Sequence, residues 1–293
     1  MRLYIHHETV YRYERKVEQS VQQLRLTPRR ESRQRTLQWR LQTPGRRAEQ
    51  ADAFGNLSHL LTVDEPLTEL RLLVEGIVET EPGCEDGRVD DEGGLSPLVY
   101  LSATPLTAAD AGIRALAVQA RLQEAFADHL LAHPVGDTGA SMTRESPAAR
   151  LERFHDLARC VREAVRYTPG ATTVDLPAAA ALTRGEGVCQ DHAHVFLACC
   201  RASGLAARYV SGYLFTGHAG DLASHAWIDV WMPGEDHRGY WMGLDVTHGI
   251  PAGSGHVRLA VGRDYLDAAP VRGIRRGGGS ESLSVRVLVG QQQ

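Results

Sequence analysis

Lysine is almost missing from this chain of 293 residues, because Lys16 is the only one and the other basic residues are arginines. No run of about 18 apolar residues occurs, so we expect neither a membrane-spanning helix nor a membrane partner. Residues 1–8 lack the apolar core of a signal peptide. Five cysteines without a CxxC pair exclude a complete disulfide framework and a cysteine-based zinc site. A reducing, cytoplasmic setting is therefore expected.

Strong charge of one sign is also lacking. The net charge of −4 argues against a nucleic-acid partner, and without an HExxH motif we expect no metal and no other cofactor. The charge is uneven, since residues 25–47 hold eight arginines and one acid, Glu31. We interpret this stretch as solvated strand faces, with a basic patch for an acidic partner as the alternative. The oligomeric state is left open.

The length and the hydrophobic content of 43% suit two domains. Residues 81–97 are rich in proline, glycine and acids, and we interpret them as a linker between domains at 1–97 and 98–293. In the first domain, Leu37, Trp39 and Leu41 alternate with polar residues, which is the period of a half-buried strand. Several such segments with turns between them predict an N-terminal antiparallel β-sandwich.

The second domain combines helical and strand patterns. Ser146 and Pro147 are typical N-cap and first-turn residues of a helix, and Thr107 with Asp110 has capping-box spacing for an earlier helix. A further helix is predicted over residues 189–203. Strands are predicted by the alternating segments 207–215, 225–232 and 240–246. Helices followed by a sheet indicate an α+β core, in which helices pack on an antiparallel sheet.

Cys189 stands at the start of a predicted helix, directly after the glycine pair Gly185 and Gly187. Thiolate is the reactive form of cysteine, and a helix N-terminus favours negative charge. The free N–H groups of the first turn can also stabilise an oxyanion. We predict that Cys189 is a nucleophile and that Cys199 and Cys200, in the middle of the helix, are core residues. The alternative is that Cys189 is an inert thiol as well.

The last two predicted strands provide partners for this thiol. If a polar turn joins them, Met232 faces Tyr240, and the same register puts His225 opposite Thr247. Asp245 is two residues from Thr247, so its side chain shares the face of His225 at a Cα separation of roughly 7 to 8 Å. We predict a catalytic triad in which His225 takes the thiol proton and Asp245 orients the imidazole.

Other residues near this triad have weaker interpretations. Asp191, His192 and His194 could indicate a metal site, but their spacing directs them to different sides of a helix. Packing or hydrogen bonding beside the site is therefore favoured for the two histidines. Trp227 shares the face of His225 and either lines a substrate cleft or belongs to the core.

These motifs resemble those of the bacterial transglutaminase-like proteins, a family described as cysteine protease candidates. The resemblance is carried by GVCQDHAH (187–194), AARYVSGY (206–213), HAW (225–227) and GLD (243–245). It extends to FGN (54–56), YTPGAT (167–172), VGRDY (261–265) and PVRG (270–273). It therefore covers nearly the whole chain.

The resemblance implies a papain-like core with the order Cys, His, Asp, an N-terminal β-sandwich, and thiol acyl chemistry on a peptide or carboxamide bond. A peptide or protein is the implied substrate. Two positions depart from the pattern. Val246 stands where the family usually has proline, and Thr183 stands where papain-type enzymes have their oxyanion glutamine. Tyr167 and Gln190 are the weak candidates for that second oxyanion donor.

We expect a thioester intermediate that goes to water, as in a peptidase or amidase, in preference to an amine, as in a transglutaminase. The alternative is a non-catalytic member of the same fold that binds peptide or scaffolds a complex. The fold by itself does not choose between these activities.

Overall fold

The computed structural model describes residues 1–81, 86–89, 94–122, 146–217, 221–222, 224–232 and 239–292. Internal contacts divide the chain into two compact units. Unit 1 comprises Met1–Gly94, Val210–Ala226 and Ala252–Gln293, and unit 2 comprises Leu95–Tyr209 and Trp227–Pro251. Among the described residues, no helix has the length and apolar character needed to cross a membrane.

The C-terminal segment belongs to unit 1, which differs from the expected domains at 1–97 and 98–293. The first boundary does fall inside the predicted linker, but residues 252–293 join the N-terminal part. The reason is the length of β1 (Arg2–Leu24), a strand of 23 residues that needs partners along both edges. β15 (Val271–Gly277) and β16 (Glu281–Gln291) pair with it in antiparallel fashion.

β1 pairs with two groups of strands along its length, and both groups belong to one sheet. Its first half pairs with β16 and β5, so that Leu3 lies opposite both Gln291 and Val78. Its second half pairs with β15 and β4. β2 pairs with β5, β3 with β4, and β10 with β16, which completes an eight-stranded sheet. The other elements of unit 1 are β2 (Gln34–Gln42), β3 (Arg46–Ala51), β4 (Leu57–Val63), β5 (Leu67–Thr80), β6 (Arg88–Val89), β10 (Asp221–Leu222), β14 (His256–Gly262) and α6 (Tyr265–Ala268).

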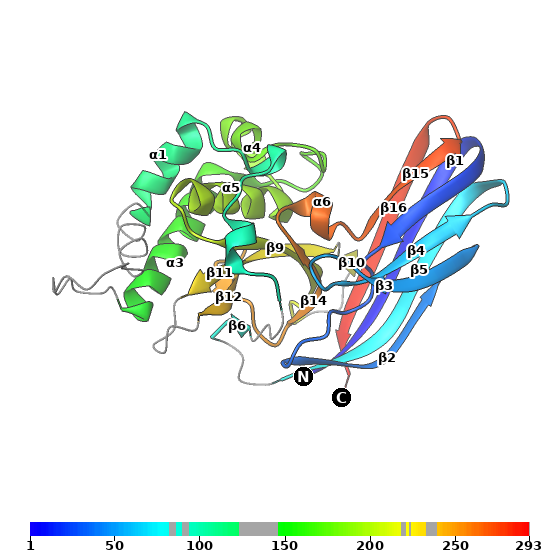
Figure 1. Cartoon of the computed structure of the whole chain (residues 1–293), viewed down its shortest axis with the longest axis horizontal. Coiled ribbons are helices and arrows are strands. Elements are labelled where there is room, and N and C mark those ends of the chain that lie inside the picture. The colour runs from blue at the N-terminus through cyan, green and yellow to red at the C-terminus, as the bar shows by residue number, and fades with distance from the viewer. Residues whose placement is uncertain are drawn as a thin grey trace. The chain divides into compact units, whose positions relative to one another are not determined.

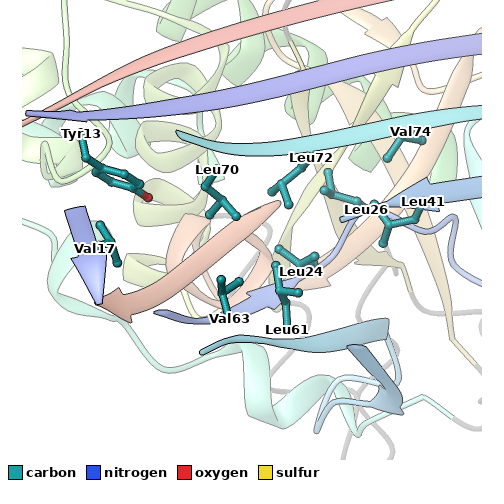
Figure 2. Close-up of a cluster of buried hydrophobic side chains, with 10 residues drawn as sticks. All are labelled: Tyr13, Val17, Leu24, Leu26, Leu41, Leu61, Val63, Leu70, Leu72 and Val74. Carbon is teal, nitrogen blue, oxygen red and sulfur yellow. The ribbon is translucent and has the colours of Figure 1, made fainter. Parts of the chain in front are cut away.

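Apolar side chains from both groups of strands form a common core. Figure 2 shows Leu61 and Val63 on one side of this cluster and Leu70 and Leu72 on the other. Strand alternation decides which residues enter it, because Leu61 is fully buried while its neighbour Leu60 is 40% exposed. The members are Tyr13, Val17, Leu24, Leu26, Leu41, Leu61, Val63, Leu70, Leu72 and Val74.

The predicted alternation in β2 is confirmed at one end only. Leu41 is buried and Trp39 packs against the core, but Leu37 is 36% exposed. The register against β5 shifts between Thr36 and Gln38, which is the signature of a bulge or a similar irregularity. This shift breaks the strict period of two that the sequence pattern assumes.

Two arginines of the stretch 25–47 are buried, whereas the sequence predicted solvated strand faces. Arg25 pairs with Asp52 at 2.7 Å, and Arg29 donates to the Phe54 carbonyl at 2.7 Å and to Asn56 at 2.9 Å. Buried charges are tolerated when they are paired and hydrogen-bonded. Residues 52–56 form a turn closed by backbone hydrogen bonds between Asp52 and Asn56 and between Gly55 and Asp52, and the two arginines bind its polar groups.

Unit 2 is built around α5 (Cys189–Ala202), whose residues 190–201 are all buried. The helices α1, α3 and α4 contact it (Figure 1). The hairpin of β11 (His225–Met232) and β12 (Tyr240–Asp245) lies between β9 and β13 in the strand order. The remaining elements are η1 (Pro97–Tyr100), η2 (Pro105–Thr107), α1 (Ala111–Gln119), α3 (Pro147–Ala164), β7 (Arg166–Tyr167), α4 (Ala178–Arg184), β8 (Glu186–Gly187) and β13 (Ile250–Pro251). The strand β9 (Ala207–Leu214) begins in unit 2 and continues in unit 1 from Val210 onward.

The helix starts agree with the sequence in two cases and differ in a third. α3 begins at Pro147 after the N-cap Ser146, and α5 begins at Cys189, both as predicted. α1 begins later than the Thr107 spacing suggested, because the Asp110 side chain accepts from the Ile113 N–H at 2.9 Å and is the N-cap. The predicted α+β class, with antiparallel sheets, helices and an N-terminal β region, is confirmed.

We expect Leu61→Ala to lower the free energy of unfolding by about 2–5 kcal/mol, because it leaves a cavity in a fully packed site. Leu60→Ala is the matched control and should change it by less than about 1 kcal/mol, since this neighbour points outward. Urea unfolding followed by circular dichroism measures both. Equal effects for the two variants would contradict the assigned faces of β4.

Candidate active site

Cys189 is the first residue of α5, and it is partly exposed. The other thiols that the structure describes, Cys160, Cys199 and Cys200, are buried. Burial raises the pKa of Cys199 to about 12 and that of Cys200 well above its ordinary value. Of the described cysteines, only Cys189 combines access to solvent with a helix N-terminus, and reactive thiolates are typical of such positions.

Asp191 explains why the helix begins at this cysteine. Its Oδ2 atom accepts from the Val188 N–H at 2.8 Å and from the Thr172 hydroxyl at 2.6 Å. The carboxylate thereby satisfies a backbone donor at the helix start and places negative charge where the helix dipole favours it. Gly187 has to be glycine here, because a Cβ atom would lie 2.7 Å from the Asp191 side chain.

The hairpin has the predicted register. Met232 pairs with Tyr240 and Ile228 with Leu244, as the sequence arithmetic required. Asp245 is the last residue of β12, and its side chain is fully buried. Asp245 therefore stands at the end of the strand where the sequence predicted the orienting carboxylate.

Asp245 also has a partner that sequence reasoning missed. The His248 backbone N–H donates to Oδ1 of Asp245 at 3.1 Å, and the His248 Nδ1 donates to Oδ2 at 2.8 Å. His248 is 43% exposed, in contrast to the buried carboxylate. An Asp whose side chain accepts from a backbone N–H a few residues later is a common turn device. The sequence feature that could have indicated this contact is therefore the Asp-x-x-His spacing of Asp245 and His248.

His225 is the first residue of β11 and is partly buried. Its ring lies 6.3 Å from that of His256, another residue of unit 1. The division between the units passes through β11, so that His225 and Ala226 are counted with unit 1 and the rest of the strand with unit 2. Cys189 and Asp245 both belong to unit 2.

The three weaker candidates for the oxyanion or substrate site have different surroundings. Tyr167 pairs with Gly187 in the short parallel ladder of β7 and β8 and is 50% exposed. Gln190 is buried, and its side chain donates to the Val174 carbonyl at 3.0 Å. Trp227 is 1% exposed, so the core interpretation is favoured over the cleft. Tyr167 is therefore the candidate whose side chain is both exposed and next to the cysteine segment.

The two histidines of α5 have separate roles, so they do not converge on one metal position with Cys189. His192 hydrogen-bonds to the Val165 carbonyl and to Thr247. His194 is fully buried beside the Tyr209 ring, and burial lowers its pKa to about 3. The expectation that these side chains pack or hydrogen-bond is met by both.

We expect Asp191→Ala to destabilise the protein by about 1.5–3 kcal/mol, because a buried charged acceptor of two hydrogen bonds is lost. Thr172→Val removes only one of those bonds and should cost less. Thermal unfolding of both single variants and of the double variant measures this. If the two effects simply add, the Thr172 hydroxyl does not act through Asp191.

Two family models match the chain. The model of the bacterial transglutaminase-like N-terminal region matches residues 3–79, and that of the transglutaminase-like superfamily matches residues 137–246. The second match includes Cys189, His225 and Asp245. The two matches correspond to the N-terminal β region and to most of the helical core.

Relatives extend this similarity over nearly the full length. The uncharacterized protein Rv2569c of Mycobacterium tuberculosis is 34% identical over 283 residues, covering 92% of this chain and 85% of the relative. The uncharacterized protein ML0607 of Mycobacterium leprae is 31% identical, covering 98% of both chains. The crystal structure of "a Putative Cysteine Protease from Cytophaga hutchinsonii" has a similar fold, with a TM-score of 0.69, 21% identity, and coverage of 99% of this chain and 90% of that one. The chain belongs to the bacterial transglutaminase-like family of the transglutaminase-like superfamily.

Proposed function

We propose that this protein is a cysteine-dependent enzyme that breaks an amide bond of a peptide, protein or carboxamide. Cys189 is the proposed nucleophile, His225 the base and Asp245 the group that orients the base. The observation that carries the proposal is a partly exposed cysteine at the first residue of a buried helix, in a chain of this superfamily. Reducing conditions keep a free reactive thiol from being oxidised, so the proposal includes a cytoplasmic location.

The hairpin register supports the pairing of base and orienting group. One step beyond Ile228 and Leu244, the same register would put Trp227 opposite Asp245. His225 is two residues before Trp227, so its side chain would leave the strand on the face that Asp245 shares. Diagonal neighbours of this kind are within reach of long side chains such as histidine.

The carboxylate of Asp245 has the capacity for this second histidine. An ionised carboxylate offers about four lone-pair sites on its two oxygens. The backbone N–H and the Nδ1 of His248 use one site on each oxygen. We propose that an imidazole N–H of His225 is a further donor to this carboxylate, which would fix the tautomer of His225 and stabilise the imidazolium.

The proposed reaction has two steps. His225 takes the proton of the Cys189 thiol, and the sulfur attacks the amide carbonyl carbon to form a tetrahedral oxyanion. The C–N bond then breaks, His225 protonates the leaving amine, and a thioester remains. Water, deprotonated by His225, attacks the thioester, so that a carboxylic acid leaves and the thiol is restored. An amine in place of water would give transamidation.

We favour hydrolysis over amine transfer. The sequence contains no recognisable amine-binding pocket that would exclude water, and the exposure of Cys189 and Tyr167 gives solvent access to the thiol region. Peptidase or amidase activity is therefore the proposed outcome. A peptide-binding role without catalysis is the competing function, and thiol reactivity distinguishes the two.

Tyr167 is the proposed second oxyanion donor. Partial burial, with a smaller contribution from the Cys189 thiolate charge, raises the pKa of Tyr167. The hydroxyl therefore keeps its proton at neutral pH and can donate to a developing oxyanion. The backbone N–H groups at the start of α5 would supply the other donor. Gln190 is a weaker choice because its amide already donates to Val174.

We expect Cys189 to react with iodoacetamide at about pH 6 faster than glutathione does, because an ordinary thiol is mostly protonated there. His225→Ala should lower this rate at least about tenfold, since general bases contribute about 10²–10⁴-fold. His155→Ala, in α3, is the matched control. Peptide mass spectrometry measures the rate at Cys189, and a rate no higher than that of glutathione would favour the binding role.

Tyr167→Phe should lower the turnover of an activated ester by about 10²-fold, as the loss of one oxyanion donor does elsewhere. It should leave the rate of Cys189 alkylation by iodoacetamide unchanged, because substitution at the iodine-bearing carbon of this reagent forms no oxyanion. Tyr4→Phe, at an exposed tyrosine in unit 1, is the control. Equal losses in both assays would show that Tyr167 positions the thiol and does not donate to an oxyanion.

A further inference from the structure

His192 is held on both of its ring nitrogens. It lies in the first turn of α5, three residues after Cys189, and is 1% exposed. Its Nε2 is 2.8 Å from the Val165 carbonyl oxygen, and its Nδ1 is 3.0 Å from the Thr247 hydroxyl. Burying a histidine so completely is costly unless its polar atoms are satisfied, as they are here.

The partners determine the tautomer of this ring. A carbonyl oxygen only accepts, so Nε2 must carry the hydrogen that is donated to Val165. In the neutral ring Nδ1 is then an acceptor, and the Thr247 hydroxyl donates to it. Burial lowers the pKa of His192, opposed by the Val165 hydrogen bond and by Asp191. The ring is therefore neutral at pH 7, with one donor and one acceptor in fixed directions.

The two bonds connect three segments that the proposed chemistry uses. Thr247 lies two residues beyond Asp245, the last residue of β12. Val165 is the C-cap of α3 and directly precedes β7, which contains Tyr167. The Tyr167 ring also lies 6.1 Å from the His192 ring. His192 is thus the side chain through which the first turn of α5 contacts both neighbouring segments.

A second contact holds the same turn after β12. Arg162 of α3 donates to the Val246 carbonyl at 3.1 Å. Gly249 leaves room for this arginine, because a Cβ atom there would lie 2.3 Å from the guanidinium. The backbone directly after Asp245 is therefore bonded to α3 at Val246 and to α5 through Thr247 and His192.

We propose that His192 is a positioning residue for catalysis, which fixes the first turn of α5 with Cys189 relative to the end of β12 with Asp245. This inference rests on the proposed function. His192 touches no reacting atom and acts through Thr247 and Val165. Misplacement of a catalytic group by about 1 Å can cost about 10²-fold in rate, so loss of this bond should be visible in the reactivity of the thiol.

The test removes the Thr247 hydroxyl and leaves His192 in place. Thr247→Val and Thr247→Ala both lose the hydroxyl donor. Two variants are used so that the test remains valid if one of them does not fold. Thr247→Ser keeps the hydroxyl and is the rescue variant, and Thr62→Val in unit 1 is the matched control. The second-order rate of Cys189 alkylation by iodoacetamide is measured from about pH 5 to 9, together with the melting temperature.

We expect Thr247→Val and Thr247→Ala to lower the rate at about pH 6 by about tenfold or more and to shift the pH profile upward, with recovery in Thr247→Ser. His192→Gln should have a similar effect, and combining it with Thr247→Val should add little. A wild-type pH profile in folded Thr247→Val and Thr247→Ala would overturn the positioning role of His192, even if the melting temperature fell. The proposed function would not be affected by that result. A wild-type Cys189 no more reactive than glutathione would overturn the proposed function and this inference with it.

Discussion

The bond between the Asp191 carboxylate and the Val188 N–H is the interaction on which the candidate site depends. It closes the first turn of α5 one residue before Cys189, and it requires glycine at position 187. A buried carboxylate in this place is stable because the helix start offers unpaired N–H groups and a favourable dipole. The exposure of Cys189 and the burial of His192 both follow from the start of α5 at Cys189.

Local patterns predicted a large part of the fold and of the candidate site. Ser146 with Pro147 marked a helix start, and the polar turn between Met232 and Tyr240 set a register that the structure confirms. These succeed because caps and hairpin registers depend on residues close in sequence. The family followed from the same segments and is confirmed, while the chemistry of the triad stays a prediction.

Long-range features could not be predicted in this way. Arg25 looked like a surface residue because its partner, Asp52, is distant in sequence and its burial depends on the sheet between them. The bond between His248 and Asp245 is not predicted by strand register, because it forms within the turn that follows β12. The sequence predicts a single second domain over residues 98–293, because nothing in the residue pattern of 271–291 indicates β1 as the partner of these strands. In each case tertiary packing decided what a local pattern leaves open.

The pairing of β1 with β16 also determines the order in which the chain can assemble during synthesis. Leu3 pairs with Gln291, so β1 cannot complete this ladder until the residues of β16 have been made. All of unit 2, residues 95–209 and 227–251, is made before then. Chain segments far apart in sequence also pair slowly, because a long loop has to close first. The helical core can therefore form before β1 has its β16 partner.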